Sequence, residues 1–102
     1  MTIDVSEKFT EVLCLKQRTQ EIIKILEQHG ATLIQYDIHT WLGRINGEEI
    51  GIGRSSFRKG VIAVQMTHET YEELEEEFLE YELQLEFLLE IEEIDKRYTK
   101  KH

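Results

Sequence analysis

The chain has 102 residues, of which 40% are hydrophobic and 32% are charged, and it carries a net charge of −9 and a single cysteine. This composition excludes a disordered chain and a disulfide-stabilised scaffold, and it indicates one small globular domain spanning residues 1–102. Because no stretch approaches the roughly 20 apolar residues of a membrane span and the first residues resemble no secretory signal, we expect a cytoplasmic protein without a membrane partner.

Residues 4–29 are expected to form an N-terminal helix. Residues 4–7 have the form of a capping box, and Gly30 would supply the glycine that follows the last turn. The polar run 16–21 weakens the apolar stripe, so two shorter helices are an alternative. The residues that recur at helical spacing are Val12, Leu15, Thr19, Ile22 and Leu26.

Residues 31–67 change to the two-residue alternation of strands. The clearest local signal is Asn46 followed by Gly47 between two alternating runs, which predicts a two-residue type I′ hairpin. Counting outward from this turn pairs Ile45 with Glu48 and Trp41 with Ile52. Residues 32–38 and 61–66 alternate too, so we expect an antiparallel meander of three or four strands. The side chains expected to face the helices are Trp41, Ile45, Ile50, Ile52, Ile62 and Val64.

Residues 68–98 are predicted to form one long helix, although every odd position from 79 to 91 is apolar, which is the pattern of a strand. The helix is favoured because Leu, Glu and Gln are strong helix formers and a strand of 13 residues would be unusually long. Such a helix measures about 46 Å and would bend or project from a domain about 34 Å across. The expected fold is therefore α+β, with both helices on one face of the sheet.

The long helix would carry two apolar stripes roughly 150° apart. The first, suited to covering the sheet, consists of Tyr71, Leu74, Phe78, Tyr81, Leu85 and Leu88. The second consists of Leu79, Leu83, Phe87, Ile91, Ile94 and Tyr98. Because a soluble monomer seldom exposes a contiguous apolar patch, the second stripe predicts a homodimer. We expect its interface at Leu83, Phe87, Ile91 and Ile94, with coverage by the N-terminal helix as the alternative.

The negative charge belongs to the long helix. Residues 69–95 hold thirteen acids and no base, whereas residues 1–68 are neutral overall. The acids repel nucleic acid and attract basic surfaces. One interpretation is a solvated face that keeps the protein soluble. The other is a docking strip for a basic protein partner, which would make the chain a regulator, an inhibitor or a nucleic-acid mimic. The candidate docking residues are Glu72, Glu73, Glu76, Glu77 and Glu80.

Other candidate sites carry less support. A basic loop at residues 54–60 could bind an anion or nucleic acid, and the residues of this alternative site are Arg44, Arg54, Arg58 and Lys59. Asp37 with His39 could transfer a proton, and His68 with Glu72 could bind a metal, although exposed turn and helix residues explain both pairs. No catalytic motif is present, so we expect a non-catalytic interaction module without a cofactor or metal.

Overall fold

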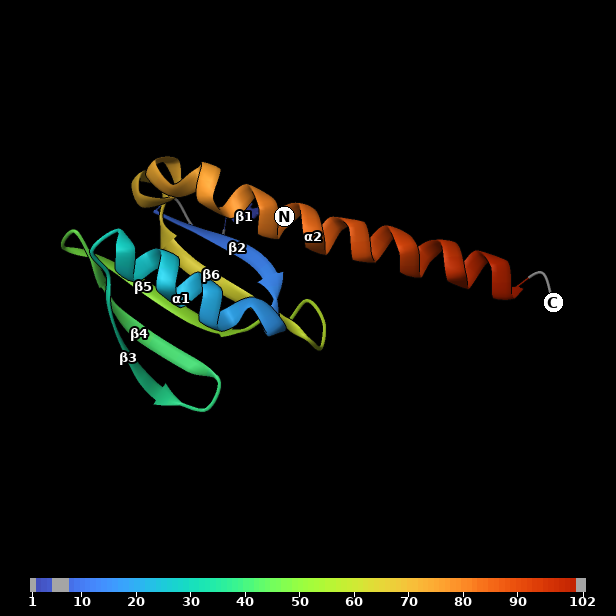
Figure 1. Cartoon of the computed structure of the whole chain (residues 1–102), viewed down its shortest axis with the longest axis horizontal. Helices are drawn as coiled ribbons and strands as arrows, with labels where there is room; N and C mark the ends of the chain where they lie inside the picture. Colours follow the sequence, from blue (N-terminus) through green and yellow to red (C-terminus); the bar gives the residue numbers. More distant parts are fainter. Residues whose placement is uncertain (1, 5–7, 101–102) are drawn as a thin grey trace.

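The computed structural model describes residues 2–4 and 8–100, which form an α+β protein (Figure 1). Within these residues the sheet has six strands in the order β1-β2-β6-β5-β4-β3, and all neighbouring strands are antiparallel. The α+β class and the antiparallel sheet are confirmed, but the sheet is larger than three or four strands. The elements are β1 (Thr2–Asp4), β2 (Phe9–Leu15), the short 3₁₀ turn η1 (Lys16–Arg18), α1 (Thr19–Gln28), β3 (Thr32–Asp37), β4 (Thr40–Ile45), β5 (Glu48–Arg54), β6 (Val61–Thr67) and α2 (His68–Lys100).

The predicted helix over residues 4–29 is wrong in its first half. Residues of this half form β1 and β2, and β2 pairs with β6 from Phe9 opposite Thr67 to Leu15 opposite Val61. Burial on this strand outweighs helix propensity, because Val12 and Cys14 are fully buried between neighbouring strands and helices. The helix begins only at Thr19, inside the polar run that weakened the stripe. The expected capping box lies largely outside the described residues.

The end of α1 agrees with the sequence. Gly30 has a φ of 91°, a left-handed conformation that glycine adopts without steric cost. The amide of Ala31 donates a hydrogen bond to the carbonyl of Leu26 across 2.9 Å, and the amide of Gly30 donates to the carbonyl of Glu27 across 3.0 Å. These two bonds form a Schellman motif, so the predicted helix-ending glycine is confirmed.

The predicted β4–β5 hairpin is confirmed with its register. Asn46 and Gly47 have φ values of 49° and 80°, as a type I′ turn requires. Trp41 lies opposite Ile52 and Ile45 opposite Glu48, with three pairs in regular register between them. The carbonyl oxygen of Thr32 in β3 lies 1.8 Å from the position that a Cβ on residue 43 would take. Glycine at position 43 therefore allows β3 to lie against β4.

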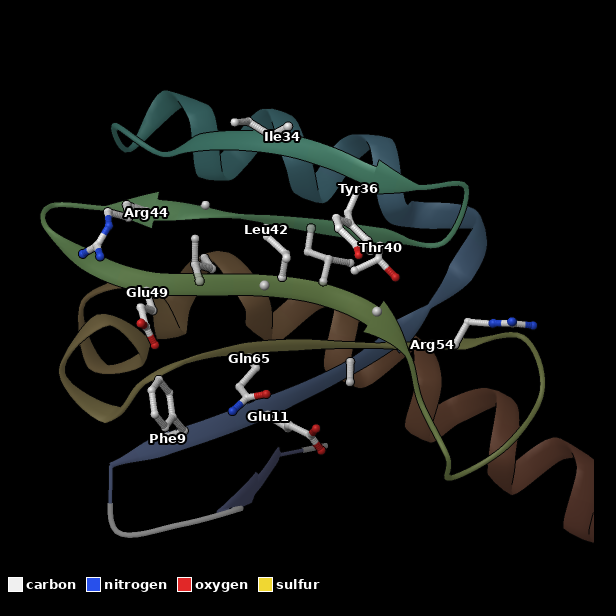
Figure 2. Close-up of a pocket in the computed structure, with 16 residues that line it drawn as sticks. Phe9, Glu11, Ile34, Tyr36, Thr40, Leu42, Arg44, Glu49, Arg54 and Gln65 are labelled. Carbon is white, nitrogen blue, oxygen red and sulfur yellow. The ribbon is translucent and has the colours of Figure 1, made fainter.

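The main core lies between one face of the sheet and the two helices. Seen from the open face, both helices lie behind the sheet (Figure 2). The predicted inward residues are confirmed, with Trp41 only partly buried. A smaller cluster joins Leu85 of α2 to Leu13, Val61 and Ala63. The fully buried side chains of the main core include Val12, Ile22, Leu26, Ile45, Ile52, Val64, Met66 and Phe78.

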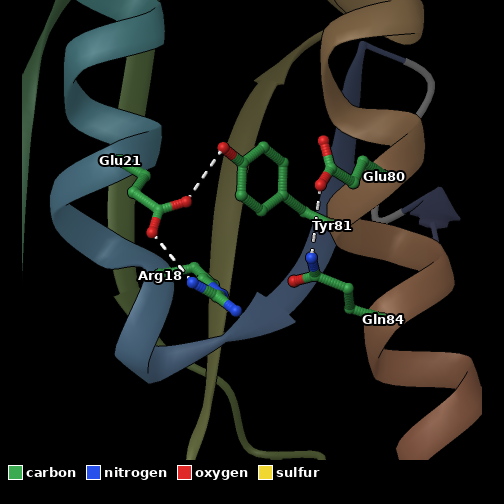
Figure 3. Close-up of polar contacts among 5 residues, drawn as sticks. All are labelled: Arg18, Glu21, Glu80, Tyr81 and Gln84. Carbon is green, nitrogen blue, oxygen red and sulfur yellow. Dashed lines mark hydrogen bonds and ion pairs between the residues drawn. The ribbon is translucent and has the colours of Figure 1, made fainter.

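Helix α2 has 33 residues, so the strand alternative for residues 79–91 is wrong. It begins beside Thr67, whose hydroxyl oxygen accepts a hydrogen bond from the amide of Thr70 across 3.2 Å. The helix lies along β2 and then extends past the end of the sheet, which is one of the two outcomes that its length predicted (Figure 1). Tyr81 ties it to α1 through Glu21, whose carboxylate also binds Arg18 (Figure 3). Within the described residues no helix is long and apolar enough to cross a membrane.

Candidate protein-binding surface on helix α2

The second apolar stripe of α2 is uncovered in the single chain from Leu79 to Ile94, and the side chain of Tyr98 lies outside the described residues. Leu79 and Leu83 are each 53% exposed, Phe87 is 64% exposed and Ile94 is 59% exposed, while Ile91 is less open. Helix α1 packs beside the first stripe, where Tyr81 reaches Glu21. The alternative in which the N-terminal helix covers the second stripe is therefore wrong. The α2–α2 dimer predicted from this stripe stays a prediction.

A shallow, open groove lies between the side chains on this exposed side of α2, and all of its lining residues belong to the helix itself. Three of its lining residues are apolar, Leu79, Leu83 and Phe87, and four are acids, Glu76, Glu80, Glu86 and Glu90, with Gln84 among them. Positions along the helix place Glu76 and Glu80 on one side of the apolar row and Glu86 and Glu90 on its other side, and Ile91 continues the row toward the C-terminal end of the helix. The predicted docking strip and the predicted dimer stripe therefore meet in one surface, in which carboxylates flank apolar side chains.

The acids of the predicted docking strip are all exposed, but they do not share one neighbourhood. Glu76 and Glu80 line the groove. Glu77 turns toward α1, where its carboxylate lies 3.5 Å from Nε2 of His29. The remaining two, Glu72 and Glu73, lie outside the groove lining. Two of the five predicted docking residues, Glu76 and Glu80, therefore line the groove, together with Glu86 and Glu90, which were not predicted.

The four bases of the alternative anion site are separated. The guanidinium of Arg44 donates a hydrogen bond to the carbonyl of Gly47 at the hairpin end of β5, and Arg54 lies at the other end. The two ends of β5, Glu48 and Arg54, are six residue steps or about 20 Å apart. Arg58 forms an ion pair with Glu92 of α2, and Lys59 lines a hollow beside Leu85. Arg44 and Arg54 both border the open face of the sheet, whereas Arg58 and Lys59 lie beside α2, so the four bases do not form one cluster.

The two candidate histidine pairs have local structural partners. The amide of His39 donates to Oδ1 of Asp37 across 2.8 Å in the β3–β4 turn, and this bond is the main reason that the pKa of Asp37 is lowered. His68 shares a hydrogen bond with the hydroxyl of Thr10 on β2. Within residues 2–4 and 8–100 no three His, Cys, Asp or Glu side chains come together to hold a metal.

A second exposed apolar surface was not recognised from the sequence. The sheet face opposite the main core carries an open hollow of about 830 Å³, which Gly51 and Gly53 help to line. Figure 2 shows this face with Ile34, Tyr36 and Leu42 labelled. Ile34 and Tyr36 of β3 border it and are 70% and 76% exposed. The alternation of residues 32–38 placed these side chains on one side. It did not reveal that α1 and the main core lie on the other side.

Comparison with protein-family models, curated protein sequences and solved structures finds no match for this chain. The fold and the α2 groove therefore indicate only the general class of the protein. It is an antiparallel α+β protein whose C-terminal helix projects from the sheet and carries an exposed apolar row with acids on both sides.

Proposed function

We propose that the protein is a non-catalytic interaction module whose α2 groove binds a basic, amphipathic segment of a partner protein. The observation that supports this proposal most is the combination of the exposed Leu83 and Phe87 with acids on both sides of their row. A partner segment with apolar side chains along one side and Lys or Arg beside them is the complement of this surface. Partner binding would place the module among regulators or inhibitors.

Apolar burial and charge would contribute differently to this contact. Covering a side chain such as Leu83 or Phe87 contributes about 1.5–3 kcal/mol when it passes from water to a fully buried state. The surrounding carboxylates mainly raise the association rate and select basic partners, and salt screens them. Binding should therefore weaken with salt but persist in part. A basic surface that normally binds nucleic acid would be blocked by such a module.

The basic segment fits the groove better than a second copy of α2 does. Two copies facing each other through Leu83 and Phe87 would bring the acids that flank this row close to the same acids of the other copy. The sequence offers compensation from the terminal bases Lys96, Arg97, Lys100 and Lys101, whose side chains lie outside the described residues. The α2–α2 dimer is accordingly treated as a competing outcome.

The test uses a synthetic amphipathic helix of about 18 residues, or five turns, with Leu on one side and Lys on the others. Calorimetric titration should show binding to the natural protein and at least tenfold weaker binding to the Phe87→Gln variant. The matched control is Ile34→Gln, which changes an equally exposed apolar residue on the sheet and should bind normally. A peptide with Glu in place of Lys should not bind.

Two results would count against the proposal. One is binding that Phe87→Gln leaves unchanged, because the peptide would then bind elsewhere on an acidic surface. The other is self-association of the natural protein that Phe87→Gln abolishes and that the Leu-Lys peptide cannot displace. That result would assign the groove to a second copy of α2.

A further inference from the structure

Strand β3, with six residues, forms an open edge of the sheet. Its hydrogen-bonded neighbour is β4 on one side, and it is the last strand of the sheet on the other. The ladder to β4 is regular over residues 32–35 and shifts between Gln35 and Asp37. The opposite edge is different, because β1 has three residues and α2 lies along β2. Half of the backbone amides and carbonyls of an edge strand point outward and can pair with another strand.

The side chains of β3 do not protect this edge. The strand holds no Lys or Pro, the residues that natural edge strands use to prevent pairing, and its one charged residue is Asp37 at the end. Ile34 and Tyr36 are 70% and 76% exposed on the open face, and Ile38 in the following turn is 76% exposed. Ile34 lies opposite Leu42 of β4, so the apolar surface continues inward from the edge.

The distribution of charge favours self-association at this edge over self-association at α2. Residues 31–47 contain one acid and one base, whereas residues 69–95 contain thirteen acids and no base. The helix lies along β2, which is four strand spacings, about 19 Å, from β3. This separation exceeds the Debye length of about 8 Å at physiological ionic strength. Two copies of this acidic protein can therefore meet at β3 with their acidic helices far apart.

We infer that the protein forms a homodimer by antiparallel pairing of β3 with β3 of a second copy across a two-fold axis. The pairing makes one continuous sheet through both subunits. It places Ile34 and Tyr36 of each copy beside the same residues of the other, and β-branched and aromatic side chains are favourable cross-strand neighbours. This inference is independent of the function proposed for α2. It leaves both α2 grooves open at opposite ends of the dimer, so the assembly would bind two partner segments, or one partner with two such segments, with avidity.

Sedimentation velocity at about 100 µM, a concentration that populates even a weak dimer with a Kd in this range, tests the inference. The natural protein should sediment as a dimer. The double variant Ile34→Lys/Tyr36→Lys places two charges on exposed edge positions and should be monomeric, with the dissociation constant raised at least tenfold. The matched control Leu83→Lys/Phe87→Lys changes two exposed apolar residues of α2 and should remain dimeric. Circular dichroism confirms that each variant is folded.

A natural protein that is monomeric at this concentration overturns the inference, and the edge is then available to an extended segment of another protein. A control variant that becomes monomeric while the edge variant stays dimeric overturns it too, and assigns the second copy to α2. Failure of the Leu-Lys peptide to bind has no bearing on these results, because the peptide reports on the groove alone.

Discussion

The hydroxyl of Tyr81 in α2 donates a hydrogen bond to Oε2 of Glu21 in α1 across 3.2 Å (Figure 3). The other carboxylate oxygen of Glu21 accepts from Arg18 across 2.9 Å. Burial, followed by the neighbouring carboxylate, raises the pKa of Tyr81. The bond joins the two helices beside the main core, so it helps to set the direction in which the exposed side of α2 points.

Replacing Tyr81 with Phe keeps the packed ring and removes this bond. We expect the free energy of unfolding to fall by about 0.5–1.5 kcal/mol, which is the net contribution of a typical hydrogen bond. Chemical denaturation followed by circular dichroism measures the change. The control is Tyr36→Phe, because Tyr36 is 76% exposed and its hydroxyl should contribute little. Equal stability of the Tyr81 variant and the natural protein would mean that water replaces the bond without loss.

Glycine at position 43 should be required for the packing of β3 on β4. A Cβ there would lie 1.8 Å from the carbonyl oxygen of Thr32, a backbone atom that cannot rotate away. Gly43→Ala should therefore cost at least about 1–3 kcal/mol, the usual range for overpacking. Gly53→Ala is the control, because a Cβ at Gly53 meets nothing within 4 Å. Thermal melts measure the difference, and an equal fall in melting temperature for both variants would contradict this prediction.

Local signals in the sequence predicted the elements that neighbouring residues determine. The Asn46 and Gly47 turn fixed the β4–β5 register, and Gly30 marked the end of α1, because both depend on backbone conformations available to few residues. Strand β2 could not be recognised in this way. Its partner β6 begins 46 residues after β2 ends, between Leu15 and Val61, and burial by this distant partner decided the structure of residues 9–15.

The α2 site was predictable in parts. Helical spacing identified the exposed stripe and the acids, and it already implied that Glu80 and Glu86 flank Leu83. Whether α1 covers this stripe depended on where α1 packs, which local sequence does not encode. The open face of the sheet was missed for a similar reason. Both Leu33 and Ile34 are apolar, so alternation along β3 cannot tell which face the helices cover.

Alkaline pH should destabilise the protein through groups that folding keeps protonated. Burial raises the pKa of Cys14 from 9.0 to about 12, and burial together with Glu82 raises the pKa of Tyr71 from 10.0 to about 12. The unfolded chain therefore loses these protons first, so the stability that they contribute is present below pH 9 and is lost as the pH rises toward 12. Urea midpoints should fall over this range.

The Cys14→Val variant separates the contribution of the thiol from that of the tyrosine. It keeps an apolar side chain of similar size in the core and should lose less stability between pH 9 and 12 than the natural protein does. The thiol should also resist a disulfide reagent at pH 8 until the protein is unfolded. Rapid labelling of the folded protein would show that Cys14 is accessible, contrary to its burial.

The acids of α2 are expected to strengthen partner binding but to lower the stability of the helix. Substitutions at two glutamates can measure these two effects separately. Glu76 and Glu73 each belong to two like-charged pairs at i,i+4, but Glu76 lines the groove and Glu73 does not. Each repulsive pair costs a few tenths of a kcal/mol, so either Glu→Gln change should stabilise the protein by about 0.5 kcal/mol at low salt.

The Glu76→Gln variant alone should also bind the Leu-Lys peptide more weakly, by about two- to fivefold, and high salt should reduce both effects. Equal weakening in both variants would indicate attraction to the overall charge of the helix, and unchanged binding in both would mean that the acids only keep the protein in solution.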